Sequence, residues 1–215
     1  MTILSVKSGT GGSLRIELAD GSFFSFKPCY FPPVFIDESL YTPGVADGCE
    51  INADEEEAFR FASACLRAEK HALQLIARAE QTVFGISRKL EKRGHKAACV
   101  RAAVGQLSDL GLLDDRRFAG LWLESRLCRQ VSTPRRLFAG LYSRGVDRND
   151  AETALRDILD SETEQRLLER YVQKQRRKIN AASDEDPAAR RSLKYLLKGE
   201  GFSHSAIQIF FESEE

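Results

Sequence analysis

The sequence predicts a mainly α-helical protein of three tandem three-helix repeats, which form an elongated, curved array after a small N-terminal β region. Three observations support this fold class. Apolar residues alternate near the start, they recur at helical spacing from residue 54 onward, and one leucine–glycine pattern occurs three times. The predicted divisions are a β region with its loop at 1–53 and helical repeats at 54–110, 111–160 and 161–215.

The first predicted element is a β-hairpin in "SLRIELADGSFFSF", residues 13–26. Leu14, Ile16 and Leu18 alternate with polar residues, which is typical of a half-buried strand. The Asp-Gly dipeptide that follows favours a two-residue turn, because glycine adopts positive φ without steric cost. Phe24 and Phe26 should then share one face of the second strand.

The segment before the first helix is predicted to be mostly loop, because it holds four of the six prolines. Within it we expect a single helical turn at Asp37–Leu40 and a third short strand at Gly48–Ile51. A sheet this small is marginally stable alone, so it should dock on the helices.

A long helix is predicted from Asp54. Acidic residues crowd its start, where they suit the positive end of the helix dipole, and no proline occurs between Pro43 and Pro134. The apolar residues at helical spacing in this segment are Phe61, Cys65, Ala68, Ala72, Leu75 and Ala79.

The repeat is visible in "ISRKLEKRGHK" (86–96), "LFAGLYSRGVD" (137–147) and "LKYLLKGEGFS" (193–203), aligned on Gly94, Gly145 and Gly201. Each segment has Ile or Leu eight residues before its glycine and Leu four residues before it. This spacing predicts a buried stripe on a helix, and the glycine suits the left-handed residue that ends the helix. The stripe residues are Ile86, Leu90, Leu137, Leu141, Leu193 and Leu197.

A further helix is expected after each of these glycines. Asp147 and Ser203, two residues past the glycine, are good N-caps, whereas Lys96 at the same place is not. The matching apolar positions in the following helices are Val100 and Val104, Ala151 and Leu155, and Ile207 and Phe211.

Two adjacent carboxylates, Asp114 and Asp115, raise the question of a catalytic or metal-binding pair. Neighbouring side chains on a helix diverge by about 100°, so the two would not converge on one point. We interpret Asp114 as a helix N-cap and Asp115 as an acid in the first turn. The run behind them places Phe118, Leu121, Trp122 and Ser125 on one helical face, with the aromatic rings expected in the core.

The net charge of zero averages two unlike parts. Residues 1–57 carry 3 basic and 10 acidic side chains, whereas residues 58–215 carry 29 basic and 22 acidic ones. The helical part therefore has a net charge of +7, which can attract nucleic acid or an acidic protein surface. Ordinary solvated helix faces are the alternative interpretation of the same charges.

The sequence favours a cytoplasmic protein without a cofactor or a metal. It has no signal peptide and no apolar run of membrane-spanning length. Five scattered cysteines, without a Cys-x-x-Cys pair, suggest reduced thiols that are each a small buried hydrophobe: Cys29, Cys49, Cys65, Cys99 and Cys128. His71 and His204 look isolated and His95 lies beside a helix end, so metal ligation is not expected at any of them.

Catalysis is not expected either, because the sequence shows no phosphate loop, dinucleotide fingerprint or nucleophile motif. We therefore predict that the protein is not an enzyme and does not itself use ATP.

The segment "GLLDDRRFAGLWLESRL", followed by "TPRRLFAGLYSRGV", resembles the second repeat of the RecX family, bacterial regulators of the RecA recombinase. The resemblance covers nearly the whole chain and is strongest over 107–146. It implies an array of three-helix repeats, without catalytic residues, that binds the RecA–DNA filament in its groove and inhibits it. It also implies roles in DNA repair, recombination and the SOS response, with weak electrostatic contact to single- or double-stranded DNA and a monomeric state.

The chain departs from the family pattern in three places. Ser132-Thr133-Pro134 replaces a Gly-Pro turn, and we expect Thr133 to cap the helix that Pro134 begins. Gly140 replaces an acidic residue and should weaken its helix by about 1 kcal/mol relative to Ala. The third repeat is interrupted by "INAASDEDPAAR".

Cationic side chains outside the leucine stripes are the candidate partner-binding residues, and the pairs that precede Leu137 and Leu193 should make the same surface of those repeats basic. The candidates are Arg88, Lys89, Lys92, Arg93 and Lys96 in the first repeat; Arg126, Arg129, Arg135, Arg136 and Arg144 in the second; and Lys174, Arg176, Arg177, Lys178, Arg190, Arg191 and Lys194 in the third.

Two other function classes fit the same residues. One is a DNA-binding transcriptional regulator that uses a helix-turn-helix, although the basic residues are spread over three repeats rather than concentrated on one helix. The other is a helical adaptor that binds only protein. Salt dependence of DNA binding without RecA would separate them, because phosphate contacts release counterions.

Overall fold

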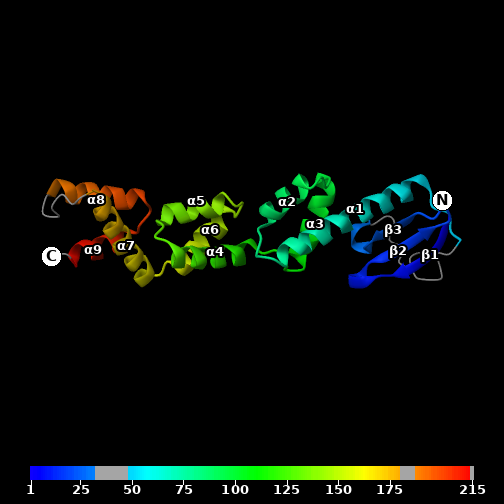
Figure 1. Ribbon diagram of the computed structural model, residues 1–215. Helices are drawn as coiled ribbons and strands as arrows, with labels where there is room; N and C mark the ends of the chain where they lie inside the picture. Colours follow the sequence, from blue (N-terminus) through cyan, green and yellow to red (C-terminus); the bar gives the residue numbers. More distant parts are fainter. Residues whose placement is uncertain (32–47, 180–186, 214–215) are drawn as a thin grey trace. The chain divides into compact units, whose positions relative to one another are not determined.

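The computed structural model describes residues 1–31, 48–179 and 187–213, which are mainly helical with a small antiparallel sheet at the N-terminus (Figure 1). This confirms the predicted fold class. The chain divides into two compact units, Met1–Leu113 and Asp114–Glu215. The finer division into a β region and three repeats, and the curvature of the array, stay predictions.

The sheet consists of β1 (Ile3–Ser8), β2 (Leu14–Leu18) and β3 (Phe23–Phe26), in that spatial order. The hairpin between β2 and β3 is confirmed, but its loop is one residue longer than expected. The amide of Leu18 donates to the carbonyl of Ser22 over 2.9 Å, and Gly21 has φ of 82°. This is a three-residue loop with glycine in the left-handed position.

The third strand was expected in the wrong place. It is β1, whereas Gly48–Ile51 only pairs with the start of the chain through an isolated bridge and hydrogen bonds such as Ile3 N to Cys49 O, 2.8 Å. The register of β1 against β2 shifts between Ile3 and Ser5. This bulge lets Ile3 and Val6, three residues apart, both face the core, so β1 lacks strict alternation. The turn expected at Asp37–Leu40 lies outside the described residues.

The sheet packs on α1 (Ala53–Ile76), as expected. Asn52 and Glu55 form a reciprocal capping box at the start of α1. Phe26 of β3 packs edge-on against Phe59 of α1, with ring centroids 5.1 Å apart. Phe24 also stacks on Phe59, so Phe24 and Phe26 contribute to the same cluster.

A buried carboxylate also joins α1 to the segment after β3. Glu69 is 2% exposed; it forms an ion pair with Lys27 and accepts a 2.7 Å hydrogen bond from the hydroxyl of Tyr30. Burial and the neighbouring carboxylate raise the pKa of Tyr30, so the phenol stays a donor.

The N-terminal unit continues with α2 (Val83–Lys92) and α3 (Ala97–Asp109). Cys65, Ala68 and Ala72 of α1 are buried as predicted, whereas Ala79 lies beyond the end of α1 and is exposed. The cysteine prediction holds only in part, because Cys65 and Cys99 are buried but Cys29 and Cys128 are exposed and Cys49 is half-buried.

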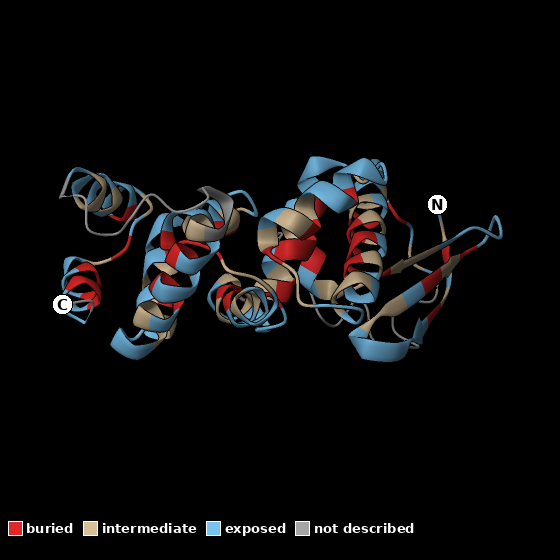
Figure 2. Ribbon diagram, turned by 60° about the vertical axis from the view of Figure 1, so that its left-hand side comes forward, coloured by how far each residue is buried: buried red, intermediate tan, exposed pale blue. Residues whose placement is uncertain are grey.

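The C-terminal unit holds six helices within its described residues: α4 (Asp115–Arg129), α5 (Pro134–Tyr142), α6 (Arg148–Ile158), α7 (Ser161–Ile179), α8 (Pro187–Gly199) and α9 (His204–Glu212). They share one hydrophobic core, in which Leu123, Leu137, Leu141, Leu168 and Leu197 are at most 1% exposed (Figure 2). Part of the interruption predicted in the third repeat, residues 180–186, lies outside the described residues.

The three aligned glycines all have left-handed backbone conformations, with φ of 87° at Gly94, 84° at Gly145 and 87° at Gly201. At each site the residue after the glycine donates to the carbonyl of the buried leucine, as Val146 N does to Leu141 O over 3.3 Å. The glycine amide also donates one turn back, as Gly145 N does to Tyr142 O over 2.9 Å. These paired bonds are Schellman motifs, so the predicted helix ends are confirmed.

We predict opposite effects for two glycine-to-alanine changes. Gly145→Ala should lower the free energy of unfolding by about 1–2 kcal/mol, because its φ is left-handed. Gly105→Ala, at an open position inside α3, should raise it by about 0.5–1 kcal/mol. Urea denaturation followed by circular dichroism measures both, and equal stability of the two variants would contradict the turn assignment.

Candidate partner-binding surface

The two carboxylates at the start of α4 lie at the N-terminal end of the helix, where Asp114 accepts a backbone hydrogen bond. Asp114 Oδ1 accepts a 2.9 Å hydrogen bond from the amide of Arg117, and Asp115 lies in the first turn of the helix. Across the residues that the structure describes, no three His, Cys, Asp or Glu side chains are placed to hold a metal ion. The N-cap interpretation of Asp114 is confirmed.

The histidine prediction was wrong for His71, which is not isolated. Its Nδ1 lies 2.7 Å from Nε2 of His95, and the two rings meet at 68°. Burial lowers the pKa of His95, and the charge of His71 and two nearby arginines lowers it further. The contact joins α1 to the residue that follows the left-handed Gly94, so it supports the turn.

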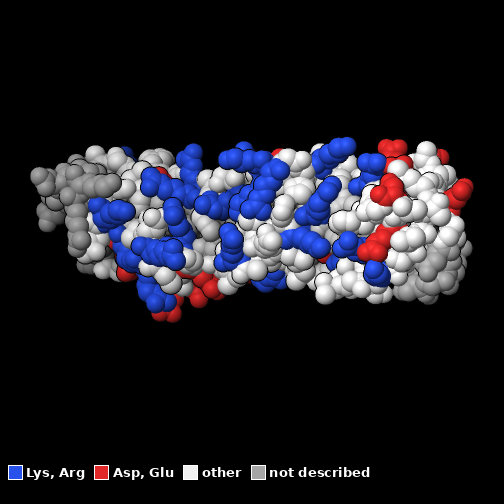
Figure 3. All heavy atoms as spheres, turned by 45° about the vertical axis from the view of Figure 1, so that its right-hand side comes forward, with Lys and Arg blue, Asp and Glu red and all other residues white. Residues whose placement is uncertain are grey.

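The first-repeat candidates line the exposed part of α2 and the turn after it. Arg88 lies over the ring of Phe84, 5.6 Å from its centroid, and Lys89 Nζ donates to Gln81 Oε1 over 2.6 Å. These contacts hold the side chains near the helix while their charges face water. Figure 3 shows Lys and Arg atoms at the surface of the helices. The candidate cations of this repeat, all of which are exposed, are Arg88, Lys89, Lys92, Arg93 and Lys96.

Trp122 of α4 organises the second-repeat candidates. Its ring lies 4.7 Å from the guanidinium of Arg144 and 5.8 Å from that of Arg126. Arg144 Nη1 also donates to the carbonyl of Gly140 over 2.7 Å. Arg129, one turn after Arg126, is exposed. The ring of Trp122 therefore lies near two cations, Arg126 of α4 and Arg144 of the turn after α5.

Gly140 has a role that the sequence analysis missed. A Cβ at this position would lie 2.5 Å from Cη2 of Trp122, so the glycine provides the space that the indole fills. The expected face of α4 also needs a correction. Phe118 and Trp122 pack against the core, but Leu121 is 50% exposed, because the buried face centres on Ala119 and Leu123.

Arg135 and Arg136 lie against the end of α8. The backbone amide of Arg135 donates to Glu200 O over 3.0 Å, its Nη1 donates to Gly199 O over 3.3 Å, and Arg136 Nε lies 3.9 Å from Glu200 Oε2. Thr133 occupies the N-cap position, but its hydroxyl donates to Glu200 over 2.6 Å instead of capping α5. These residues therefore join α5 to α8.

The two arginine pairs do not occupy equivalent positions. Aligned on the repeat glycines, Arg135 matches Arg191, whereas Arg136 matches Ser192 and Arg190 matches Pro134. The shared basic surface expected from these pairs therefore reduces to one position in each repeat.

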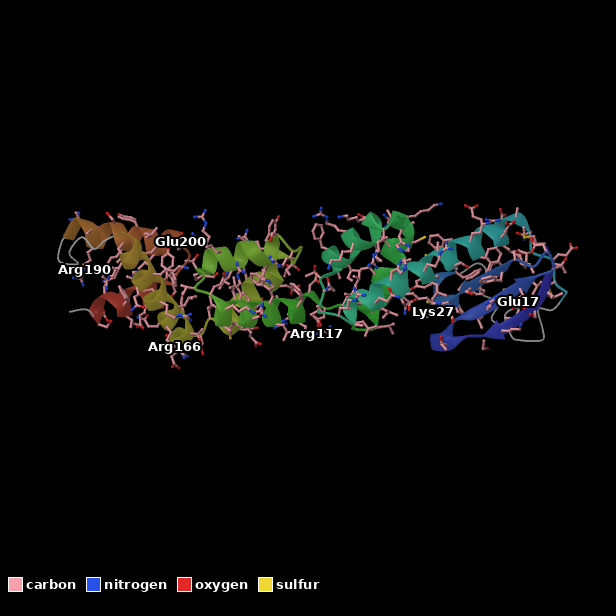
Figure 4. The ribbon with its side chains drawn as sticks, in the orientation of Figure 1. Glu17, Lys27, Arg117, Arg166, Arg190 and Glu200 are labelled. Carbon is pink, nitrogen blue, oxygen red and sulfur yellow. The ribbon has the colours of Figure 1, made fainter. Side chains whose placement is uncertain are left out.

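In the third repeat, α8 places its candidates beside α9. Arg190 Nη2 donates to the carbonyl of Phe211 over 2.9 Å, and Lys194 Nζ lies 4.7 Å from the centroid of the Phe211 ring. Figure 4 labels Arg190 and Glu200 at opposite ends of α8. On α7, Lys174 is exposed and Arg176 is half-buried, while the side chains of Arg177 and Lys178 lie outside the described part.

Replacing the cap should weaken α4 without removing any chemical activity. Asp114→Ala should lower the free energy of unfolding by about 0.5–2 kcal/mol, whereas Asp114→Asn, which keeps an acceptor oxygen, should stay near wild type. Thermal and urea unfolding compare the two. If Asn costs as much as Ala, the side-chain oxygen does not act as a cap.

Gly140→Ala should destabilise the protein even though alanine favours helix. The new Cβ forces Trp122 to move, which we expect to cost about 1–3 kcal/mol and to change the emission of this sole tryptophan. Gly120→Ala in α4, where a Cβ meets nothing within 4 Å, is the matched control and should not destabilise. Unchanged emission and stability in Gly140→Ala would show that the close contact is unimportant.

Comparison with known proteins agrees with this architecture. A family described as "RecX, second three-helix domain" matches residues 114–155. Two crystal structures share the fold: "regulatory protein RecX" (TM-score 0.72, 20% identity, 98% of both chains) and RecX from Lactobacillus salivarius (0.60, 19%, 71% of this chain and 97% of that one).

Relatives with higher identity carry the same name. Regulatory protein RecX of Treponema pallidum (strain Nichols) is 36% identical over 118 residues, which cover 55% of this chain and 72% of the relative. Regulatory protein RecX of Mycobacterium leprae (strain Br4923) is 31% identical over 155 residues, 72% of this chain and 84% of the relative. Within the described ranges, no helix is both long and apolar enough to cross a membrane. On the identity and coverage of these relatives, the chain belongs to the RecX family of regulatory proteins.

Proposed function

We propose that this RecX family member regulates the RecA recombinase by binding the assembled RecA–DNA filament through the candidate cations described above, and so modulates recombination and DNA repair. Membership of a family of regulatory proteins supports a regulatory role. The resemblance over 107–146 supplies RecA as the partner.

One observation about ion pairing carries the proposal. Most of the candidate cations have no carboxylate within ion-pair distance among the described residues. Arg60, Arg148 and Arg166, which are not candidates, each pair with a glutamate one turn before or after them on their own helix, whereas the non-candidates Lys70 and Arg101 have no such pair among the described residues. The candidates without such an ion pair are Arg88, Lys89, Lys92, Arg93, Lys96, Arg126, Arg129, Arg135, Lys174, Arg191 and Lys194.

Unpaired exposed cations are available to an external anion. An ion pair already formed on the surface must be broken before its cation can contact a partner, whereas a cation without an ion pair has no carboxylate contact to give up. Cations repeated along successive helices can each contribute a weak contact, and such contacts sum when they are held on one chain. This predicts binding that is strongly sensitive to salt.

The choice of test residues follows from the contacts. Reversing Arg135 and Arg136 would also remove the contacts of their side chains with Gly199 O and the Glu200 carboxylate, so loss of activity in that variant would be ambiguous. Arg88 and Lys92 lie one turn apart on α2, and both are exposed. Neither belongs to the buried stripe, so their reversal should leave the fold intact.

We expect wild-type protein, titrated into RecA on single-stranded DNA, to lower ATP hydrolysis by RecA. The double variant Arg88→Glu, Lys92→Glu should need about ten-fold more protein for the same inhibition, because favourable contacts become repulsive. Added salt should weaken wild-type binding with a steeper slope than it weakens binding by the variant.

The control variant Lys70→Glu, Arg101→Glu makes the same charge change at exposed positions of α1 and α3 outside the candidate set, and it should inhibit nearly as wild type does. Circular dichroism confirms that both variants are folded. If folded wild type leaves hydrolysis and filament length unchanged at about micromolar excess, the RecA assignment fails and an adaptor that binds only protein becomes the better interpretation.

A further inference from the structure

The surface between α8 and α9 is hollowed into an open groove of about 690 Å³. Four lysines and arginines line it, against a single carboxylate, Glu212. The other lining side chains are a histidine, a glutamine and apolar residues. The lining residues are Arg190, Arg191, Lys194, Tyr195, Lys198, His204, Ile207, Gln208, Phe211 and Glu212.

Two of the cations are held in place by Phe211 of α9. Arg190 donates to its backbone carbonyl over 2.9 Å and lies 5.3 Å from its ring, and Lys194 lies 4.7 Å from the same ring. Phe211 itself is 4% exposed and belongs to the core. Arg190 and Lys194 are therefore held against a buried residue. Less side-chain conformational entropy is then lost when a ligand binds to them.

Four side chains of α8 share one face toward the groove. Arg191, Lys194, Tyr195 and Lys198 follow the spacing of neighbours on a helix surface. Within the described part of the chain, the three cations have no carboxylate partner at ion-pair distance. Tyr195 is 76% exposed, so its ring stands open to solvent between them.

This combination is confined to the third repeat. Aligned on the repeat glycines, Lys194, Tyr195 and Lys198 correspond to Phe138, Ala139 and Tyr142 in α5 and to Ser87, Arg88 and Glu91 in α2. The leucine stripe does not require these residues, because it is retained in α2 and α5 without them. The groove therefore has a chemistry beyond that of a general basic repeat surface.

We propose that the α8–α9 groove binds the phosphate backbone of single-stranded nucleic acid, with Tyr195 stacking on an unpaired base. Cations beside an exposed aromatic ring are the combination that such ligands use, because every base offers a flat face and every linkage a charge. An acidic protein segment would use the charges but has no need of the open ring. The inference rests on the proposed function and assigns direct contact with the strand to one site.

The test measures binding of the full chain, without RecA, to a fluorescein-labelled oligothymidine of about 20 nucleotides by fluorescence anisotropy. Arg191→Glu, Lys194→Glu should raise the Kd at least about ten-fold and flatten its salt dependence. Tyr195→Ala should raise the Kd about five-fold or more, whereas Tyr195→Phe, which keeps the ring, should bind as wild type does.

Lys70→Glu, Arg101→Glu is again the charge-matched control, since these residues belong to the N-terminal unit and line no part of the groove. The proposal is overturned if the groove variant binds as tightly as this control, or if Tyr195→Phe loses as much affinity as Tyr195→Ala. It is also overturned if a polyglutamate peptide competes as well as unlabelled oligothymidine, which would indicate an acidic protein ligand. Melting curves verify folding.

The outcome is separable from that of the proposed function. If groove variants bind the oligonucleotide normally while wild type still inhibits RecA, only the proposal that the groove binds nucleic acid is refuted. Wild type that binds the oligonucleotide through the groove but leaves RecA unaffected would refute only the RecA assignment.

Discussion

The fold depends on one local constraint: a buried leucine must be followed, four residues later, by a residue that can adopt the left-handed conformation. At Leu90, Leu141 and Leu197 this residue is glycine, and the turn returns its hydrogen bonds to the helix that it ends. The chain then reverses within two residues, so the next helix packs back on the same leucine. Without this reversal a helix of nine or ten residues, such as α5 or α2, would have too little partner surface to bury its stripe.

Features with a local signature could be predicted from the sequence, and those that depend on distant partners could not. The Asp114 cap and the glycine turns involve residues within one or two turns of each other, so their spacing is visible in the chain. The strand β1 was not predicted, because its bulge breaks the alternation of apolar and polar residues. The contact of His71 with His95, and that of Gly140 with Trp122, each bring together residues from separate parts of the chain. A histidine or a glycine in the sequence does not indicate which distant residue it will contact.

The candidate surface illustrates the same limit. The sequence identifies cations but not their partners, so Arg136, which pairs with Glu200, and Arg191, which has no carboxylate partner among the described residues, looked alike. The α8–α9 groove adds Tyr195 and Lys198, which were not among the candidates. Their relevance depends on α9 standing beside α8, and that proximity is set by the core residues Phe210 and Phe211 rather than by the charges.

Glu200 joins the start of α5 to the end of α8. Its carboxylate accepts the hydroxyl of the fully buried Thr133, and its backbone oxygen accepts the amide of Arg135, a first-turn donor of α5 that has no partner inside its own helix. Removing the third repeat would strip both acceptors from a buried helix start. A chain truncated before α7 would therefore leave the start of α5 without these partners, so we expect these helices to unfold together as one cooperative unit.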